Sequence, residues 1–312
     1  MNRLNKYKNF YLIVDEIIKR SSSQKIKIRK FLNSVDARYY TRAENFAEKF
    51  LEYLKVEKIG FDYSIKAYLK LCTDMMVSQK YFLKFKKYPV NDEKIAYKEV
   101  YDNVNEMKSY MIGVAMSQFL WPTHYAMYSF FIEKISNENS KIKNYLEIGP
   151  GHGLFLIQAL EKLKKDTNFE IVDISKTSVK ITKSIVNFLV KKEKKINYTI
   201  RNIFDFKSPN KFDFITIGEV LEHVTKPQKI LKQLNNLISD NGSIYMSTCV
   251  DCPSIDHVYH FKSVKEIEQM IRNCGFKILD NLVLPVEDKP MKEIIQNKIT
   301  INYCAHVKKA NL

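Results

Sequence analysis

Apolar residues in the first part of the chain recur at the spacing of a helix. From Tyr11 to Ile135 they lie three or four positions apart, with almost no alternating run and few turn signals. Pro122 stands where the first residue of a helix is expected, which predicts one helix ending near Leu120 and another over residues 123–136. We therefore expect an all-helical domain over residues 1–140, closed by a polar hinge at residues 137–140.

After the hinge, short apolar strands alternate with amphipathic helices. Strands are predicted over residues 144–148, 169–172, 197–200, 212–217, 243–248, 276–284 and 299–307. Helices are predicted over 154–164 and 227–238, and a further helix should begin after Ser263, which forms a capping box with Glu266, and end at Gly275. Asn241-Gly242 is expected to form a turn before the fifth strand. Residues 141–312 should therefore form an α/β domain with a mostly parallel, Rossmann-like sheet ending in an antiparallel strand pair.

The strongest chemical signal is the segment Tyr145-Leu-Glu-Ile-Gly-Pro-Gly-His-Gly153, in which the first strand runs directly into a glycine loop and a helix. Glycines let the backbone approach a ligand closely, and the free N–H groups of the helix can hold a carboxylate or phosphate. Asp173 lies twenty residues beyond Gly153, at the end of the next strand. A carboxylate in that position can accept hydrogen bonds from both hydroxyls of a ribose.

These residues resemble the first motif of class I S-adenosylmethionine-dependent methyltransferases, an acidic residue followed by alternating glycines. The matching positions are Glu147, Gly149, Gly151 and Gly153. Dinucleotide oxidoreductases space their glycines as G-x-G-x-x-G, so the loop favours methyl transfer over hydride transfer. Residues 211–223, Lys-Phe-Asp-Phe-Ile-Thr-Ile-Gly-Glu-Val-Leu-Glu-His, resemble the fourth strand and following helix of the small-molecule branch, which includes the ubiquinone-type methylases. The resemblance covers about 170 residues.

The resemblance implies S-adenosyl-L-methionine as cofactor and assigns binding roles to several residues. Asp173 would bind the ribose, and Asn202 with Ile203, at the end of the third strand, would flank the adenine. Gly218 and Glu219, at the end of the fourth strand, would lie beside the methionine part. Many relatives carry Asp where this chain has Asn202, whose amide carbonyl can still accept a hydrogen bond from the adenine amino group.

Two histidines follow the fifth strand, in the segment Asp256-His-Val-Tyr-His-Phe261. Open α/β sheets bind substrates beyond the carboxyl ends of their strands, and histidine suits proton abstraction near neutral pH. We predict that one of them is the catalytic base, with His257 preferred to His260; a role as loop anchors is the alternative. His223 follows Glu219 by one helical turn and is a candidate substrate contact.

An aromatic cluster lies just upstream of the first strand and includes Trp121, His124 and Tyr125. Aromatic residues at helical spacing form a core in most proteins, but here they could also form a lid that contacts the substrate. The helical domain is accordingly expected to act as a cap that shapes the substrate pocket. Residues 109–132 lack charged side chains but contain Pro122 and several polar residues, so we interpret them as buried protein and not as a membrane span.

The formal net charge of +16 is spread evenly, because residues 1–140 and 141–312 each carry +8. A nucleic-acid-binding surface needs clustered basic residues, so the total charge does not by itself predict one. Residues 218–221 are Gly-Glu-Val-Leu, where base N-methylases have an Asn/Asp-Pro-Pro-aromatic motif. Thr248-Cys249 resembles the Thr-Cys of RNA cytosine-5 methyltransferases, but their second motif, Pro-Cys, is absent. A nucleic-acid substrate is therefore disfavoured.

The five cysteines are too few and scattered for a disulfide framework, and the N-terminus lacks a signal-peptide core, so a cytoplasmic location is expected. Cys249-Val-Asp-Cys252, with His257 and His260 nearby, could suggest zinc. A single C-x-x-C without a second spaced pair is a weak signal, and no metal is predicted.

The expected function is methyl transfer from S-adenosylmethionine to a hydroxyl or amine of a small biosynthetic intermediate, with anionic and carrier-tethered intermediates as candidates. In such a reaction the protein mainly aligns the acceptor, excludes water and takes up a proton. Two alternatives stay open at this point. An RNA methyltransferase would carry a contiguous basic track beside the cofactor, and a non-catalytic cofactor-binding protein would lack an acceptor pocket.

Overall fold

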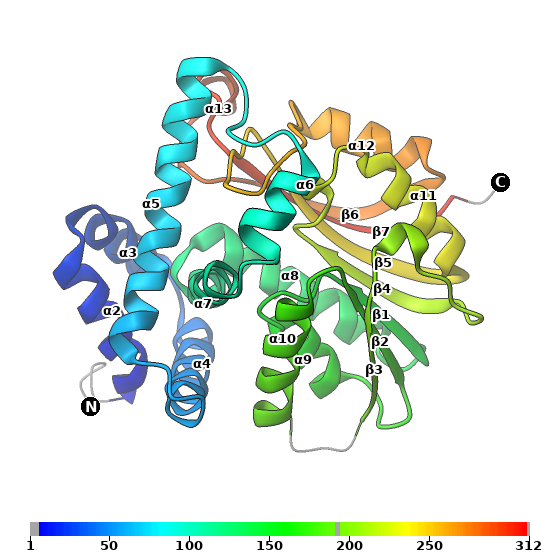
Figure 1. Cartoon of the computed structure of the whole chain (residues 1–312), viewed down its shortest axis with the longest axis horizontal. Coiled ribbons are helices and arrows are strands. Elements are labelled where there is room, and N and C mark those ends of the chain that lie inside the picture. The colour runs from blue at the N-terminus through cyan, green and yellow to red at the C-terminus, as the bar shows by residue number, and fades with distance from the viewer. Residues whose placement is uncertain (1–5, 191–193, 311–312) are drawn as a thin grey trace. The chain divides into compact units, whose positions relative to one another are not determined.

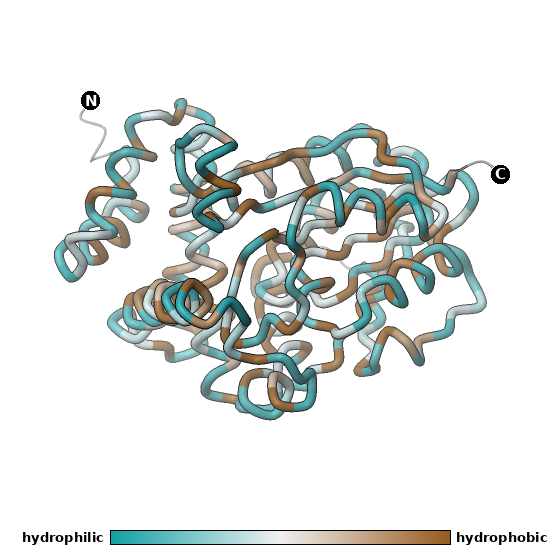
Figure 2. The backbone as a smooth tube through the Cα atoms, turned by 90° about the horizontal axis from the view of Figure 1, so that it is seen from above, coloured by the Kyte–Doolittle hydropathy of each residue, from teal (hydrophilic) through white to brown (hydrophobic). Residues whose placement is uncertain are grey.

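A computed structural model describes residues 6–190 and 194–310 of the chain; Figure 1 draws its helices and strands, and Figure 2 colours its backbone by hydropathy. The chain divides into two compact units. The first unit comprises the residues up to Thr73 together with Ser109–Tyr125, and the second comprises Asp74–Lys108 with Ala126 onward. Among the described residues, no helix combines the length and apolar content that crossing a bilayer requires.

The first unit is built entirely of helices. It contains α2 (Lys8–Arg20), α3 (Ser22–Ser34), α4 (Ala37–Val56), the first half of α5 (Phe61–Phe85), most of α7 (Val104–Leu120) and the start of α8 (Pro122–Glu138). Side chains cap several of these helices: Asp36 accepts from the backbone N–H of Tyr39 at 2.9 Å, for example. Pro122 is the first residue of α8, as predicted from the sequence.

Aromatic side chains fill the interior of this unit. Tyr39 is 1% exposed, donates a hydrogen bond to the carbonyl of Phe119, and packs edge-on against Phe31 and Tyr125. Gly113 allows α7 to approach α5 closely, because a Cβ at this position would lie 3.0 Å from the carbonyl oxygen of Ala67. The interior therefore depends on both aromatic packing and close helix contact.

The second unit contains a seven-stranded sheet in the order β3-β2-β1-β4-β5-β7-β6, coloured from green β1 to red β7 in Figure 1. The strands are β1 (Asn144–Ile148), β2 (Asn168–Asp173), β3 (Lys195–Ile200), β4 (Phe212–Gly218), β5 (Ile238–Val250), β6 (Phe276–Pro285) and β7 (Ile301–Lys309). Strands β1 to β5 are parallel, and β7 pairs antiparallel with both β5 and β6. The predicted fold class is confirmed.

Helices cover both faces of this sheet. On one face α11 (Pro227–Leu237), α12 (Val264–Asn273) and α13 (Met291–Gln296) contribute Leu234, Ile271 and Ile294 to one core with strand residues such as Ile215 and Ile244. On the other face Phe131 of α8 packs against Phe155 of α9 (Leu154–Lys162) and against Tyr245 of β5. Helix α10 (Lys176–Leu189) contacts β2 and β3. This layering places the carboxyl ends of β1, β2, β4 and β5 along one edge.

One predicted turn in this unit differs from the structure. The predicted Asn241-Gly242 turn is wrong, because both residues lie inside the 13-residue strand β5, where the register with β4 shifts. A Cβ at Gly242 would lie 2.9 Å from the carbonyl oxygen of Phe212, so this glycine serves close strand approach. The cap at Ser263 is confirmed, because Ser263 Oγ accepts from the N–H of Glu266 at 3.1 Å, but the Glu266 carboxylate accepts from the N–H of Lys262 at 2.8 Å and so does not complete the predicted box. Gly275 follows the helix with φ +84°.

The expected domain boundary at residue 140 also differs from the division into compact units. Residues 126–138 of α8 belong with the sheet because Phe130 and Phe131 pack against Tyr245. Residues 74–108 belong there as well, and they include α6 (Glu93–Ala96) and a π-helical turn, η1 (Tyr97–Tyr101). Helical periodicity identifies helices but does not show which helices pack on the sheet.

Candidate active site

The glycine loop after β1 has a backbone that only glycine adopts without strain. The φ angles of Gly149, Gly151 and Gly153 are +64°, +49° and +72°. A Cβ at Gly149 would lie 2.7 Å from Cγ2 of Val220. At Gly151 it would meet no atom nearer than the carbonyl oxygen of Gly149, at 4.0 Å. The loop is therefore shaped by its glycines and leaves open space beside Gly151, as a cofactor-binding loop requires.

Helix α9 starts directly from this loop, and His152 caps it. Nδ1 of His152 accepts a hydrogen bond from the backbone N–H of Leu154 at 3.1 Å, and burial lowers the pKa of His152 to about 4. The imidazole is therefore a neutral acceptor at physiological pH. Thr182 of α10 donates to the carbonyl of Gly151 at 2.7 Å, which fixes the loop from the other side.

Glu147, the acidic residue of the motif, lies beneath the loop and is 1% exposed. The Tyr145 hydroxyl lies 2.5 Å from its Oε2 and 2.9 Å from Oγ1 of Thr216, and the backbone N–H of Leu156 also bonds to the carboxyl group. Burial raises the pKa of Glu147 to about 8. In the structure Glu147 holds the loop and the first turn of α9, and its contact with the cofactor stays a prediction.

Asp173 is the last residue of β2, and its carboxylate is held by the first turn of α10. Oδ1 accepts from the backbone N–H of Ser175 at 2.8 Å, and Oδ2 accepts from the Ser178 hydroxyl at 2.7 Å. Burial raises the pKa of Asp173 to about 6. Each carboxylate oxygen can accept a further hydrogen bond, so the predicted interaction with two ribose hydroxyls is compatible with this geometry.

Asn202 and Ile203 lie just beyond β3, at the start of the short helix η2 (Ile203–Asp205). The Asn202 side-chain oxygen accepts from the backbone N–H of Phe204 at 3.1 Å, so this amide serves as a helix cap. Ile203 is 7% exposed and belongs to the sheet core. The adenine contacts predicted for this pair stay predictions, and the half-exposed Phe204 lies beside them.

The carboxyl end of β4 carries strain at a polar residue. Glu219 has φ +52°, and its backbone N–H donates to the carbonyl of Ser247 at 3.0 Å. Oε1 of Glu219 is buried and has no hydrogen-bond partner among the described residues. Burial and the neighbouring Glu222 raise the pKa of Glu219 well above its usual value. Gly218 permits close packing, because a Cβ there would lie 3.0 Å from Cε2 of Phe155.

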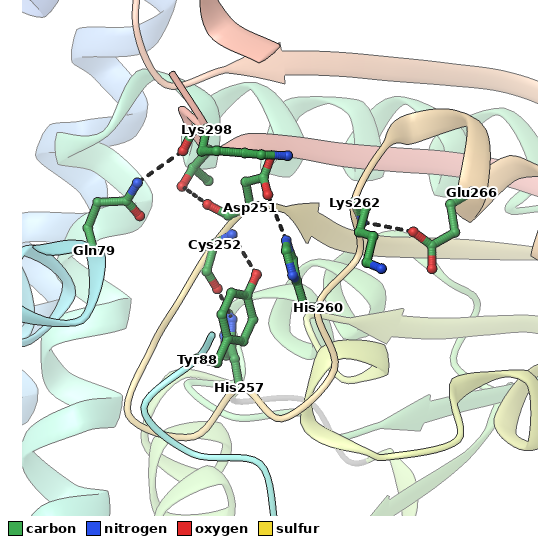
Figure 3. A network of polar contacts seen from close by, with 10 residues as sticks. Gln79, Tyr88, Asp251, Cys252, His257, His260, Lys262, Glu266 and Lys298 are labelled. Carbon is green, nitrogen blue, oxygen red and sulfur yellow. Dashed lines mark hydrogen bonds and ion pairs between the residues drawn. The ribbon is translucent and has the colours of Figure 1, made fainter. Parts of the chain in front are cut away.

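The two histidines of the segment after β5 have different surroundings (Figure 3). His257 is 6% exposed, and its Nδ1 lies 2.6 Å from the carbonyl oxygen of Cys252. Nε2 of His260 lies 2.6 Å from Oδ1 of Asp251, and the His260 side chain is 24% exposed. Lys298 approaches the other carboxylate oxygen of Asp251 at 3.6 Å. The structure therefore gives His260 a carboxylate partner and seals His257 inside the protein.

Tyr101 is a residue of this edge that the sequence did not reveal. It lies in the π-helical turn η1, a conformation often found at functional sites. Its hydroxyl donates to Oδ2 of Asp256 at 3.0 Å, and its carbonyl accepts from the Ser175 hydroxyl at 2.8 Å. Nδ1 of His223 lies 3.1 Å from the carbonyl oxygen of Asp256. Tyr101 thus joins the end of β2 to the segment after β5, with His223 alongside.

The predicted lid residues all belong to the first unit. Trp121 donates from Nε1 to the Tyr68 hydroxyl at 3.0 Å, and His124 Nδ1 lies 2.8 Å from Oγ of Ser117. Tyr125 packs against Tyr39. These contacts anchor the cluster within the helical unit. The proposed substrate contact of the three residues stays a prediction, as does the role of residues 1–140 as a cap.

The sheet order, the glycine loop and the carboxylate at the end of β2 define a class of protein. They are the features of a class I S-adenosylmethionine-dependent methyltransferase. The cofactor fits the residues present, because space is open beside Gly151 and the buried Glu219 Oε1 can accept from an ammonium group. Asp173 would hold the ribose and Glu219 the methionine part.

Comparison with known proteins gives the family. The model of a family described as "Methyltransferase domain" matches residues 124–281, half of the chain, and the chain belongs to this family. The ubiquinone biosynthesis O-methyltransferase of Coxiella burnetii (strain Dugway 5J108-111) is 28% identical over 187 residues, which cover 53% of this chain and 76% of that protein. The mitochondrial ubiquinone biosynthesis O-methyltransferase of Saccharomyces cerevisiae is 32% identical over 104 residues, 33% of this chain and 32% of that protein.

Solved structures show the same fold at low sequence identity. The N-methyltransferase NodS from Bradyrhizobium japonicum WM9, in complex with S-adenosyl-L-homocysteine, aligns with a TM-score of 0.51 and 14% identity, covering 67% of this chain and all of that chain. Magnesium protoporphyrin IX methyltransferase from Synechocystis PCC 6803 aligns with a TM-score of 0.53 and 12% identity, covering 70% and 98%. These structures share the fold, and the family model makes the protein a methyltransferase, with S-adenosyl-L-methionine as its cofactor.

Proposed function

We propose that the protein methylates a hydroxyl group, or alternatively an amine, of a small biosynthetic intermediate. One observation carries the proposal: the ends of β1, β2 and β4, where the cofactor-binding residues lie, share an edge of the sheet with a His–Asp pair after β5. The similarity to ubiquinone O-methyltransferases supports oxygen as the acceptor atom.

The chain's own residues have three tasks in such a reaction. Asp173 and Glu219 hold the cofactor, which supplies an electrophilic methyl group on its sulfonium when bound. The buried polar groups at the ends of β4 and β5 orient the acceptor and exclude water. A base must take the hydroxyl proton as the methyl group arrives, because the oxygen otherwise acquires a positive charge.

His260 suits the role of base better than His257, which reverses the order expected from the sequence. The Asp251 carboxylate at 2.6 Å favours the tautomer with the proton on Nε2 of His260, and this leaves Nδ1 as the basic nitrogen. His260 also packs against the rings of Phe82 and Tyr88, which hold its imidazole in place. His257, by contrast, is nearly inaccessible and directs Nδ1 at a carbonyl oxygen.

We propose further that the methyl acceptor is anionic or is tethered to a carrier protein. A pocket of about 560 Å³ is lined by Lys226, Lys229 and Lys232 together with Phe204 and Thr225. Three cationic side chains around an aromatic ring would attract a phosphate or carboxylate group, or an acidic carrier surface. Glu93 contributes one opposing charge, but its Oε1 accepts hydrogen bonds from the backbone and side chain of Thr225.

Transfer of a labelled methyl group tests this function. The protein and S-adenosylmethionine tritiated at the methyl group would be incubated with cell extract, which is then separated into metabolites, carrier proteins and RNA. We expect label among the metabolites or on a carrier, and much less label with Asp173→Ala. Label in RNA, or no label in any fraction despite tight cofactor binding, would contradict the proposal.

A further inference from the structure

Two cysteines and a histidine form a buried cluster at the end of β5. Cys249, Cys252 and His257 are 2%, 4% and 6% exposed, and their potential ligand atoms all lie within 4.8 Å of one another. Asp251, between the cysteines, has φ +48°, which turns the chain tightly after β5. The role of His260 in methyl transfer does not involve these three side chains.

The donor atoms of the cluster, two thiols and an imidazole, are of the types that structural zinc sites use. With Zn–S bonds of about 2.3 Å and Zn–N bonds of about 2.0 Å, neighbouring donors lie roughly 3.5–3.8 Å apart. Nδ1 of His257 lies 3.8 Å from Sγ of Cys249 and donates a hydrogen bond to the carbonyl oxygen of Cys252 at 2.6 Å, so metal binding must displace this proton. Thiolate sulfur and imidazole nitrogen favour Zn²⁺ over Mg²⁺ or Ca²⁺, which prefer oxygen ligands.

A fourth donor lies beside the cluster. Glu222 is 1% exposed; its Oε2 accepts from the Thr248 hydroxyl at 2.8 Å, whereas its Oε1 has no hydrogen-bond partner among the described residues. Its carboxylate forms one potential ligand group with Glu219 and Cys249 and another with His223 and His257, whereas no such group joins it to Cys252. A buried carboxylate oxygen without a partner is costly, and a dication would offset that cost.

From this arrangement we infer that Cys249, Cys252, His257 and Glu222 bind a zinc ion. Four protein ligands complete the coordination, as in structural zinc sites, so the ion holds the segment after β5 against the end of β4. Backbone contacts already join the same parts, since the carbonyl of Glu222 accepts from Val258 and Tyr259 at 2.9 Å. Metal uptake releases protons from the thiols and the imidazole, so affinity falls at low pH.

Elemental analysis and cobalt substitution of the full chain test the site. The purified protein, reconstituted with Zn²⁺ under reducing conditions and desalted, should retain about one zinc per chain. Cys252→Ser should lose it, whereas Cys274→Ser, which removes a buried thiol at the end of α12, should not. Co²⁺ in place of zinc should give thiolate-to-metal charge-transfer absorption and the visible bands of tetrahedral cobalt.

A measurement on the wild-type chain tests the site even if the Cys252→Ser variant misfolds. Titration of the zinc-loaded wild-type protein with an organomercurial should release zinc in proportion to the thiols consumed, as followed with a colorimetric chelator. A folded wild-type chain that retains neither zinc nor cobalt would overturn the inference. Zinc retained equally by Cys252→Ser, or cobalt without charge-transfer absorption, would also overturn it, because the ligands would then not include these thiols.

Discussion

The two ends of the sheet edge differ in how their polar groups are satisfied. At the cofactor end, Asp173 has a hydrogen bond on each carboxylate oxygen, and the glycine loop is fixed by His152 and Thr182. At the acceptor end, which also holds Glu219, the residue proposed to bind the methionine part of the cofactor, three buried carboxylate oxygens have no partner among the described residues: Glu219 Oε1, Glu222 Oε1 and Asp256 Oδ1. The first end is preorganised for a constant ligand, whereas the second retains unmet bonding capacity for a methyl acceptor, the cofactor's ammonium group or a metal.

Removal of the proposed base should have the largest effect. It should lower the rate of methyl transfer and leave cofactor binding unchanged. We expect His260→Ala to lower the single-turnover rate by about a hundredfold or more, because no other group takes the acceptor proton. Single-turnover kinetics with the acceptor identified by label transfer would measure this. Tyr259→Phe, which removes a hydroxyl from the same segment, is the control. Full turnover by His260→Ala would exclude His260 as the base.

The matching change at the cofactor end should act on binding. Asp173→Ala removes an acceptor of two ribose hydrogen bonds, so we expect affinity for S-adenosylhomocysteine to fall by about 2–3 kcal/mol, roughly 30- to 150-fold. Calorimetric titration gives the value. Asp166→Ala changes an exposed aspartate in the turn before β2 and should leave the affinity unchanged. Equal affinities of the two variants would remove Asp173 from the site.

Cofactor affinity should fall gradually with decreasing pH because of Asp173 at the cofactor end. The hydroxyl donors of the ribose need an ionised acceptor, and the pKa of Asp173 is raised to about 6 by burial. Cofactor affinity should therefore be full above pH 6 and decline about tenfold per pH unit as the pH falls below it. Asp173→Asn should flatten this dependence at lower overall affinity. A wild-type affinity that is constant between pH 5 and 7 would contradict the assigned role.

The smallest expected effect concerns the lysine-lined pocket beside α11. Reversing two of its charges with Lys229→Glu and Lys232→Glu should raise the KM for an anionic or carrier-bound acceptor several-fold, with little change in kcat. Lys265→Glu, on the exposed part of α12, supplies a charge-matched control. If the double variant and the control have the same KM, the acceptor does not use this pocket.

The cofactor end could be predicted from the sequence because its features are local. Glycines at positions 149, 151 and 153 and an aspartate at the end of the next strand require only a strand, a loop and a helix in succession. The same local logic explains why most strands and the serine cap at Ser263 agree with the prediction. The turn at Asn241-Gly242 is predicted wrongly because this dipeptide, which is common in turns, lies here where two strands approach closely.

The acceptor end could not be predicted to the same depth, because its contacts join distant parts of the chain. The Tyr101–Asp256 bond spans 155 residues, and no motif marks Tyr101. His257 and His260 are both candidate bases by sequence pattern, with His257 preferred, and only tertiary structure gives His260 a carboxylate partner and His257 a carbonyl. The weak C-x-x-C signal gained weight only when Glu222 and His257 were found beside it.

The most direct test of the division of labour between the two ends is calorimetric titration of S-adenosylhomocysteine into Asp173→Ala and His260→Ala, measured side by side with the wild-type protein. We expect affinity to fall only in Asp173→Ala, whereas His260→Ala should bind S-adenosylhomocysteine as tightly as the wild type. Loss of affinity in His260→Ala, or unchanged affinity in a folded Asp173→Ala, would show that the two ends are not divided in this way.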